Sequence, residues 1–481
     1  MSNPLFKKFM EYALGSGLVL LLGFISSPLN TRLFSPEEFG KFSMFNLWSN
    51  IIAVLILVGL DQSFVRYFHE EQEINRSKLL IQTLKIPLLA LLIVSILMLL
   101  FSKVLLVSLF STYSLSLLLL LIINNLFVLL NRYIFLVIRM QQKGKIFSYL
   151  QIAQKLLMIA FTIVFFIFLK DNFLVLISAF VFSNILVTLI GLHIEKNFWF
   201  QNNKGKKLKT TNRELVVFGY PLVFTFLITW LFQSADRIFI KHFSDYSELG
   251  LYAAAFSIVA LLNSVQSAFT MFWVPVAYEK YNLDPTNKSF FEKVSKGISF
   301  IMLLISACLI LSKDLLVLIL GEDFREASSI VPFLIFMPLM YTVSETTVLG
   351  INFLKKSKYH IIIALLSAAL NIIGNLLLVP SYGAIGAAIS TGVSYILFFT
   401  LRTFISKKFY PNRYGLGKFY FCIFNLLIFA WYASFHEVDL VYIILGIETI
   451  IVICILYLND VLPLFLKKYK GKLLRKDSQS M

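Results

Sequence analysis

Residues 34–42 read FSPEEFGKF, and residues 243–252 read FSDYSELGLY, 209 positions later. Each copy has Phe-Ser, a short polar turn, a glutamate, an apolar residue, a glycine, any residue and an aromatic residue. Each copy stands between two long apolar stretches, and a glutamate follows each first phenylalanine by 36 residues, at Glu70 and Glu279. This repetition predicts an internally duplicated membrane protein with two related halves, which is an architecture typical of transporters.

The composition indicates a membrane protein. The 481 residues are 58% hydrophobic and 14% charged, whereas about 25% of residues are charged in soluble proteins, and the mean hydropathy is +0.82. The apolar residues form solid blocks of about 20, the length of a membrane-crossing helix, without the alternation of a membrane barrel. We predict an all-α polytopic membrane protein with about 14 spans, near residues 12–30, 43–62, 84–101, 115–137, 149–169, 173–193, 215–235, 249–275, 298–312, 330–354, 360–379, 383–405, 417–435 and 438–458.

The net charge of +17 is distributed unevenly between the two sides of this topology. When the hydrophilic segments are numbered alternately, one set holds 33 of the 43 Lys and Arg residues, and the other set holds eight. Arg132 and Lys155 fall inside spans. Basic residues concentrate on the cytoplasmic side of membrane proteins, so both termini are predicted to be cytoplasmic. The excess of positive charge is therefore a topology signal and implies no nucleic-acid partner.

The duplication also predicts the division of the chain. Residues 1–201 would form an N-terminal six-helix bundle, residues 202–214 a cytoplasmic basic linker, and residues 215–405 a C-terminal six-helix bundle. Residues 406–481 would add two further spans and a basic cytoplasmic tail. The second half begins after an even number of spans, so both halves start on the same side of the membrane and run in the same direction. They are therefore predicted to form a parallel repeat.

Little in the sequence suggests an enzyme. The cysteines Cys308, Cys422 and Cys454 lie in apolar segments, without disulfide or metal-ligand spacing. The longest loops, near 194–214 and 277–297, are about twenty residues long, and no Gly-rich phosphate motif is present. We therefore expect no catalytic residues, no metal and no cofactor, and a function carried out within the bilayer.

Charged residues within or beside the spans are candidates for a binding site. A charged side chain at the membrane centre costs about 2.5–3.5 kcal/mol, so it usually faces a water-filled cavity or a partner. Arg132 lies well inside the fourth span. A cationic lumen and portal would bind an anionic cargo, and guanidinium groups suit phosphate. Lys155, Arg32 and Arg237 could instead extend to the interface. The predicted substrate-binding residues are Arg132, Lys155, Arg32, Arg237 and Arg66.

Three carboxylates are candidates for ion coupling. Glu345 lies in the middle of a span, Asp61 ends the second span, and Asp236 ends the seventh. Glu345 could instead be a neutral hydrogen-bonding group, and Asp236 could cap a helix. Several amides in the fourth and fifth spans could contact sugar hydroxyl groups or join helices, namely Asn124, Asn125, Asn131, Gln151 and Gln154.

Four segments resemble motifs of one transporter family. They are residues 28–40 (PLNTRLFSPEEFG), 59–67 (GLDQSFVRY), 235–240 (ADRIFI) and 371–394. Over about residues 10–405 the chain is similar to the Wzx-type polysaccharide flippases, which transport O-antigen or capsule repeat units and belong to the MOP superfamily of MATE-like transporters. Residues at matching motif positions include Arg32, Asp61, Asp236 and Arg237, whereas Arg132, Lys155 and Glu345 rest on the residue argument alone.

The resemblance implies that the chain is a multi-pass protein of the bacterial cytoplasmic (inner) membrane. It would flip undecaprenyl-pyrophosphate-linked oligosaccharide from the inner to the outer leaflet by alternating access of two six-helix bundles. H+ or Na+ would be the coupling ion, and the other partners would be membrane lipids and the polymerase and chain-length machinery. The alternatives are a lipid II flippase or a multidrug/cation antiporter of the same superfamily, and more remotely a membrane-embedded polysaccharide polymerase.

Overall fold

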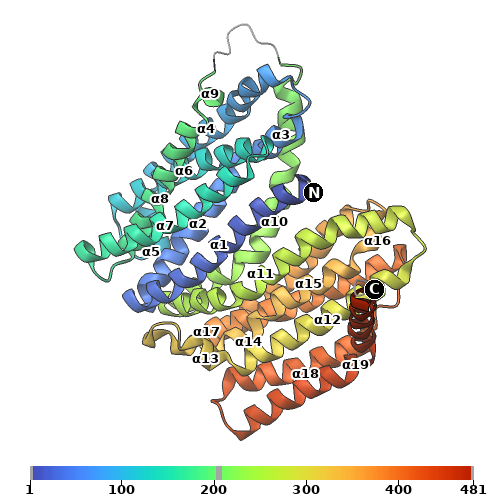
Figure 1. Ribbon diagram of the computed structural model, residues 1–481. Coiled ribbons are helices and arrows are strands. Elements are labelled where there is room, and N and C mark those ends of the chain that lie inside the picture. Colours follow the sequence, from blue (N-terminus) through green and yellow to red (C-terminus); the bar gives the residue numbers. More distant parts are fainter. Residues whose placement is uncertain (1–3, 202–207, 478–481) are drawn as a thin grey trace. The chain divides into compact units, whose positions relative to one another are not determined.

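The described part of the chain consists of helices and the short segments that connect them, with no strand among the described residues (Figure 1). This computed structural model describes residues 4–201 and 208–477, and the side chains of residues 15, 17–201 and 208–460. Residues 202–207 of the predicted linker and 478–481 of the predicted tail lie outside the described residues. The all-α class predicted from the apolar blocks is confirmed.

Two compact units make up the chain, and we describe each by itself. Unit 1 comprises Met1–Lys241 and Asp245–Ala253, and unit 2 comprises His242–Ser244 and Ala254–Met481. The predicted domains divide between residues 201 and 215, whereas the first boundary between the two units lies between Lys241 and His242, near the C-terminal end of α10. The helices through α10 are α1 (Pro4–Leu33), α2 (Pro36–Leu57), α3 (Leu60–Tyr67), η1 (Glu73–Asn75), α4 (Arg76–Leu100), α5 (Ser102–Phe110), α6 (Leu115–Met140), α7 (Gly144–Leu169), α8 (Phe173–Ile194), α9 (Lys196–Trp199) and α10 (Asn212–Phe243).

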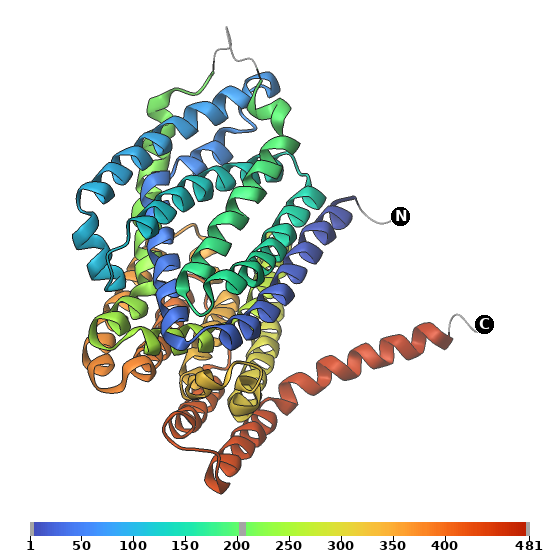
Figure 2. The same cartoon turned by 90° about the vertical axis from the view of Figure 1, so that its left-hand side faces the viewer.

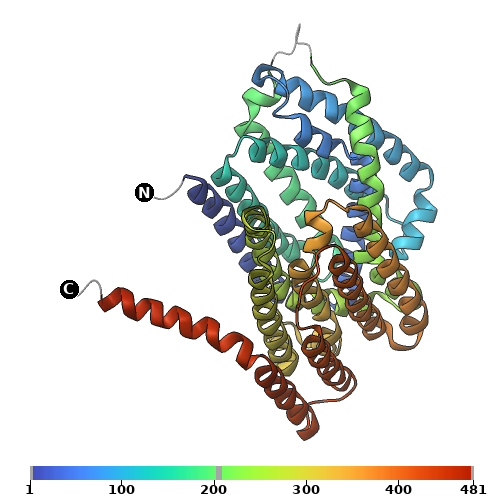
Figure 3. The ribbon, with the colours of Figure 1, turned by 90° about the vertical axis from the view of Figure 1, so that its right-hand side faces the viewer.

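Helix α11 (Tyr246–Leu283) begins in unit 1 and continues into unit 2. The unit 2 helices that follow include α18 and α19, of which α19 extends well beyond α18 (Figures 2 and 3). Their bounds are α12 (Lys288–Leu311), α13 (Lys313–Val317), η2 (Glu322–Ser329), α14 (Val331–Leu334), α15 (Phe336–Thr347), α16 (Leu349–Phe353), α17 (Lys358–Phe409), α18 (Leu416–Phe435) and α19 (Leu440–Asp477).

The predicted spans coincide with these helices, but not one to one. Span 43–62 crosses the break between α2 and α3, and span 330–354 contains α14, α15 and α16. Spans 360–379 and 383–405 share α17. In the described residues, 11 helices are long and apolar enough to cross a membrane, or up to 12 if η2 and α14–α15, which meet at 54°, form one span. Helix α17 has 52 residues, about 78 Å at 1.5 Å per residue, which exceeds a hydrocarbon core of about 30 Å.

Helix α17 is in fact a helical hairpin. Gly383 interrupts it with φ 51° and ψ −130°. A Cβ on Gly386 would lie 2.5 Å from the carbonyl oxygen of Leu378, and a Cβ on Gly374 would lie 2.7 Å from the hydroxyl of Ser390. These contacts join residues on opposite sides of Gly383, so the two arms run antiparallel. Helix α17 therefore accounts for two of the predicted spans, and the total of about 14 stays a prediction.

The two copies of the repeated motif each begin a long helix. In the first copy, the Ser35 hydroxyl accepts a hydrogen bond from the backbone N–H of Glu38 at 3.5 Å. In the second copy, a carboxylate oxygen of Asp245 accepts one from the backbone N–H of Glu248 at 2.9 Å. Such acceptors satisfy N–H groups that have no partner within the helix. The sequence repeat is thus a helix start used twice, at α2 and at α11.

Within unit 1 these two helix starts contact each other through their glycines. A Cβ on Gly40 would lie 1.9 Å from the carbonyl oxygen of Tyr246, and a Cβ on Gly250 would lie 1.9 Å from that of Pro36. No larger side chain fits at either position without displacing backbone. The contacts are reciprocal, as expected for duplicated segments that pack against each other around a local two-fold axis. Small residues allow this close approach of helix backbones.

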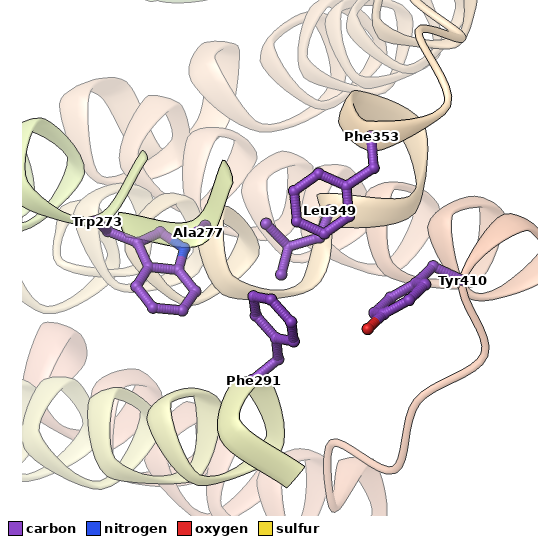
Figure 4. Close-up of a cluster of buried hydrophobic side chains, with 6 residues drawn as sticks. All are labelled: Trp273, Ala277, Phe291, Leu349, Phe353 and Tyr410. Atoms are coloured by element: carbon purple, nitrogen blue, oxygen red, sulfur yellow. The ribbon is translucent and has the colours of Figure 1, made fainter. Parts of the chain in front are cut away.

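Unit 2 has an aromatic core where α11, α12, α16 and the end of α17 meet (Figure 4). The indole N–H of Trp273 donates to the backbone carbonyl of Glu345 at 3.1 Å and so connects this core to α15. The Phe353 ring stacks on Tyr281 with 3.9 Å between centroids. The buried side chains of the core are Trp273, Ala277, Phe291, Leu349, Phe353 and Tyr410.

Candidate functional site

An ion pair between Arg132 and Asp61 lies inside unit 1. Nε and Nη2 of Arg132 donate to the same carboxylate oxygen of Asp61, at 3.1 and 2.9 Å. Helix α2 ends at Val58 and Gly59, whose φ values are 50° and 70°, and this break places Asp61 in the first turn of α3. The Asp61 side chain is 3% exposed and that of Arg132 is 46% exposed. Asp61 therefore holds one edge of a guanidinium whose remaining donors are accessible.

Beside this pair is a cavity of about 490 Å³, which we call the arginine cavity. It is lined by α2, α3, α6 and α10, all within unit 1, and it includes Arg132, Asp61 and Arg237. Its lining residues on α10 follow a helical stripe that includes Trp230, Gln233 and Arg237. The indole nitrogen of Trp230 is buried and has no hydrogen-bond partner among the described residues. The cavity thus combines two guanidinium groups and an indole donor with one carboxylate.

A second cavity of about 380 Å³, the amide cavity, is lined by α2, α6, α7 and α8. It shares Asn50, Val128 and Arg132 with the arginine cavity, so the two adjoin at Arg132. Arg132 and Arg139 are its charged residues, and its described lining contains no carboxylate. The aromatic and amide side chains that line it are Phe135, Phe147, Phe180, Asn46, Asn50, Asn131, Gln151, Gln154 and Asn184.

A chain of side-chain hydrogen bonds crosses the four helices beside the amide cavity. Gln154 on α7 donates to Asn184 on α8 at 2.6 Å. Asn184 donates to Asn124 on α6 at 3.0 Å, and Asn124 donates to Ser49 on α2 at 2.6 Å. Hydrogen bonds between polar side chains join helices inside a membrane protein. Asn124 and Gln154 therefore act in part as structural links, which was one of the two roles expected for them.

Unit 2 contains a separate buried ion pair. Nη1 of Arg402 on α17 donates to Glu345 at 2.9 Å and to the Ser344 hydroxyl at 2.6 Å, and both charged side chains are less than 10% exposed. The guanidinium also lies over the rings of Tyr341 and Phe398, 5.5 and 5.0 Å from their centroids. The sequence argument counted Arg402 with the hydrophilic segment that follows the twelfth span, although it lies near the end of that span at 383–405, so this partner of Glu345 was not predicted.

The other predicted carboxylate, Asp236, is buried in unit 1. It accepts a hydrogen bond from the phenol of Tyr252 at 2.6 Å. Asp236 neighbours Arg237 in sequence, and the described lining of the arginine cavity includes Arg237 but not Asp236. Of the three ion-coupling candidates, Asp61 therefore lines a cavity, whereas Asp236 and Glu345 lie in packed surroundings.

The remaining predicted cations lie elsewhere. Arg32 is exposed at the end of α1, and Arg66 forms an exposed pair with Glu70 at 2.5 Å. Lys155 lies on α7, one heptad after Ser148, whose side chain faces Gly15 of α1. In the parts of the chain whose side chains are described, the lining of both cavities leaves out these three cations. The structure thus brings together Arg132 and Arg237 from the predicted set.

Several lining residues were missed by the sequence argument. Arg139 was assigned to a hydrophilic segment, yet it lines the amide cavity together with Arg132. The signal was present as a helical stripe on α6, because Val128, Arg132, Phe135 and Arg139 recur at spacings of four, three and four residues. Asn184 gave no comparable signal, since a single amide in an apolar span does not reveal its neighbours.

Sequence comparisons relate the chain to known proteins. A family model described as "Polysaccharide biosynthesis protein" matches residues 5–279. The chain is 24% identical over 200 residues to "Capsular polysaccharide biosynthesis protein CapF" of Staphylococcus aureus, and the alignment covers 40% of this chain and 48% of that protein. The chain thus spans about half the length of this relative.

Solved structures with the same fold include a flippase and multidrug transporters. The lipid II flippase MurJ, in an inward closed conformation, superposes with a TM-score of 0.69 at 17% identity, covering 94% of this chain and 99% of that one. A MATE family multidrug resistance transporter of the MOP superfamily gives 0.58 at 15% identity in an inward-facing conformation, covering 82% and 94%. In an outward-facing conformation such a transporter gives 0.56 at 13% identity, covering 83% and 93%.

Proposed function

The chain belongs to the polysaccharide biosynthesis protein family, and from this premise we propose that it flips lipid-linked oligosaccharide repeat units across the bacterial cytoplasmic membrane. The cargo would be carried on undecaprenyl pyrophosphate and would move from the inner to the outer leaflet by alternating access. Family membership supports a role in polysaccharide export, and the fold shared with MurJ and MATE transporters supports a flippase rather than an enzyme.

The arginine cavity is the observation that supports an anionic cargo. The lining includes two guanidinium groups, those of Arg132 and Arg237, and one carboxylate, that of Asp61, so it carries net positive charge. Arginine binds phosphate through paired charge-assisted hydrogen bonds. We assign Arg132 and Arg237 to the pyrophosphate, with the Trp230 N–H as an additional donor. Asp61 would keep the Arg132 guanidinium in position between transport cycles.

The cations outside the cavities fit the path to and from this site. Arg32 and Arg66 are exposed to solvent and would attract the anionic head group at the portal. Lys155, which is partly buried on α7, would attract it between the portal and the cavities. An anion that leaves a cell with a negative interior gains about 2.3 kcal/mol per charge per 100 mV. The membrane potential would therefore favour export.

Coupling to H+ or Na+ is part of the proposal, and the three carboxylates differ as candidates. Asp61 borders the arginine cavity and pairs with Arg132, so an ion or proton that binds Asp61 would release the guanidinium toward the pyrophosphate. Glu345 is balanced by the buried Arg402, and Asp236 is hydrogen-bonded to Tyr252. Neutralising Asp61 would leave the Arg132 guanidinium without its carboxylate partner. Asp61 is therefore the candidate most directly linked to cargo.

A lipid II flippase is the alternative that shares the fold and an anionic lipid cargo. The fold similarity to MurJ alone does not distinguish the two cargoes, whereas the family description and the capsule-related CapF favour repeat units for surface polysaccharide. A multidrug antiporter for cations is disfavoured, because the two cavities together contain three arginines and one carboxylate among their described lining residues.

The test is to delete the gene and to extract undecaprenyl-linked intermediates from each leaflet. Accumulation of complete repeat units on the cytoplasmic side, with loss of surface polymer, would support the proposal, and mass spectrometry would identify the sugars. Accumulated lipid II would instead support the alternative flippase. Incomplete units, or complete units that already face outward, would place the defect in synthesis or polymerisation and would contradict the proposal.

A further inference from the structure

The two adjoining cavities of unit 1 differ in the buried polar groups that lack a partner among the described residues, although Arg132 lines both cavities and Arg139 lines the amide cavity. In the arginine cavity, this group is a donor, the indole N–H of Trp230, and the guanidinium groups of Arg132 and Arg237 belong to the same lining. In the amide cavity, the buried groups without a partner among the described residues are acceptors, namely the side-chain carbonyl oxygens of Asn131 and Gln151. A pyrophosphate offers acceptors, and a sugar hydroxyl or acetamido N–H offers a donor.

From this difference we propose that the amide cavity is the saccharide subsite of unit 1, and that it holds the lipid-proximal sugars while the arginine cavity holds the pyrophosphate. The inference rests on the proposed flippase function and deepens it. Arg132 lines both cavities and would stand at the junction between phosphate and first sugar.

The lining of the amide cavity fits a hydroxyl-rich ligand. Its volume of about 380 Å³ lies in the range of about 300–1,000 Å³ that is usual for small-molecule sites. Three phenylalanines line it, and Phe135 and Phe147 form an edge-to-face pair with 5.2 Å between centroids. Such aromatic surfaces can cover the apolar C–H face of a sugar ring, while a few polar groups fix its orientation. The described lining has no carboxylate that would repel an acidic sugar.

The amides beside this cavity divide into two sets. Gln154 and Asn184 belong to the hydrogen-bonded chain that joins four helices, so their groups are already used within the protein. In the described part of the chain, Asn131 and Gln151 make no side-chain hydrogen bond. Their oxygens are buried although both residues line the cavity, and the terminal torsion of an amide is soft, so rotation of the amide can turn the oxygen toward a bound sugar. Buried polar groups without partners are costly, and a ligand donor would satisfy them.

This division yields a test that separates the saccharide subsite from the phosphate site. Gln151→Leu and the double variant Asn131→Leu/Gln151→Leu remove acceptors without breaking a hydrogen bond recorded in the structure. Asn125→Leu is the matched control, because Asn125 lies on α6, donates only to the carbonyl of Leu121 four residues earlier, and lines neither cavity among the described residues. The probes are undecaprenyl pyrophosphate and the lipid-linked oligosaccharide extracted from the deletion strain.

Equilibrium binding of each labelled probe to purified protein in nanodiscs is the measurement. We expect wild type and Asn125→Leu to bind the glycosylated lipid more tightly than the bare lipid. The double variant should bind the glycosylated lipid roughly tenfold more weakly and the bare lipid unchanged, and Gln151→Leu should show part of this loss.

Three other outcomes would overturn the inference. The first is a double variant that keeps the wild-type preference for the glycosylated lipid, and the second is one that loses affinity for both probes equally. The third is a wild-type protein that binds the two lipids equally well, which would leave the flippase proposal standing. A wild-type protein that binds neither probe would instead contradict the proposed function itself.

Discussion

Replacing Arg132 by alanine tests whether this residue binds the cargo or only balances Asp61. The structure assigns two of its guanidinium N–H donors to Asp61, at 3.1 and 2.9 Å. An arginine has five such donors, and the side chain is 46% exposed beside the two cavities. Most of its hydrogen-bonding capacity is therefore available to a ligand.

The two roles differ in expected magnitude. One or two charge-assisted hydrogen bonds to pyrophosphate, at about 1.5–3 kcal/mol each, correspond to roughly 10-fold weaker binding or more when they are lost. Breaking the pair with Asp61 costs stability as well. Breaking fully buried pairs costs about 3–5 kcal/mol and exposed pairs contribute about 0–1 kcal/mol, so this half-exposed pair should fall between these values.

A second variant separates the two effects. In Arg132→Ala/Asp61→Asn the carboxylate no longer needs a cationic partner, so stability lost in Arg132→Ala should return, as measured by the thermal midpoint of the purified protein. Binding of undecaprenyl pyrophosphate and display of surface polysaccharide should not return. Arg132→Lys, which keeps the charge but loses the planar fork, should retain part of the binding.

Restored polysaccharide display in the double variant would refute the binding role, because Arg132 would then serve only to neutralise Asp61. Normal display from a stably inserted Arg132→Ala protein would refute it as well. Loss of membrane insertion in Arg132→Ala alone, with recovery in the double variant, would assign the residue to folding.

Three further predictions concern other parts of the structure. Gly250→Val should lower the thermal midpoint, because a Cβ there would lie 1.9 Å from the carbonyl oxygen of Pro36 and overpacking costs about 1–3 kcal/mol. The control Gly417→Ala should leave the midpoint unchanged, because a Cβ at Gly417 meets nothing within 4 Å. Equal midpoints for the two variants would contradict the close packing of α2 against α11. Arg402→Ala should reduce the yield of folded protein more than Arg402→Lys, since it leaves Glu345 buried without a counter-charge; equal yields would mean that the pair contributes little. Glu345→Gln should alter the dependence of export on the H+ or Na+ gradient, and unchanged dependence in a transport assay would make Glu345 a packing residue.

The sequence predicts the elements of this protein well, because helix formation in a membrane depends on properties that are local in the chain. Blocks of about 20 apolar residues must form helices that satisfy their own backbone groups, and the predicted spans coincide with helices, although two of them are interrupted by breaks between helices. The repeated motif likewise predicts two equivalent helix starts. Its Ser35 and Asp245 caps lie within three residues of the N–H groups that they satisfy.

The partners of the polar residues depend on packing between helices that are far apart in sequence. Arg132 meets Asp61 only because the break after α2 turns Asp61 toward α6, and Glu345 meets Arg402 across 57 residues. Lys155 lies inside a span as Arg132 does, but the rotation of α7 places it on the face that includes Ser148. Helical periodicity defines which residues share a face, whereas the neighbour of that face, and hence the charge and hydrogen bonds that it meets, follows from the tertiary packing.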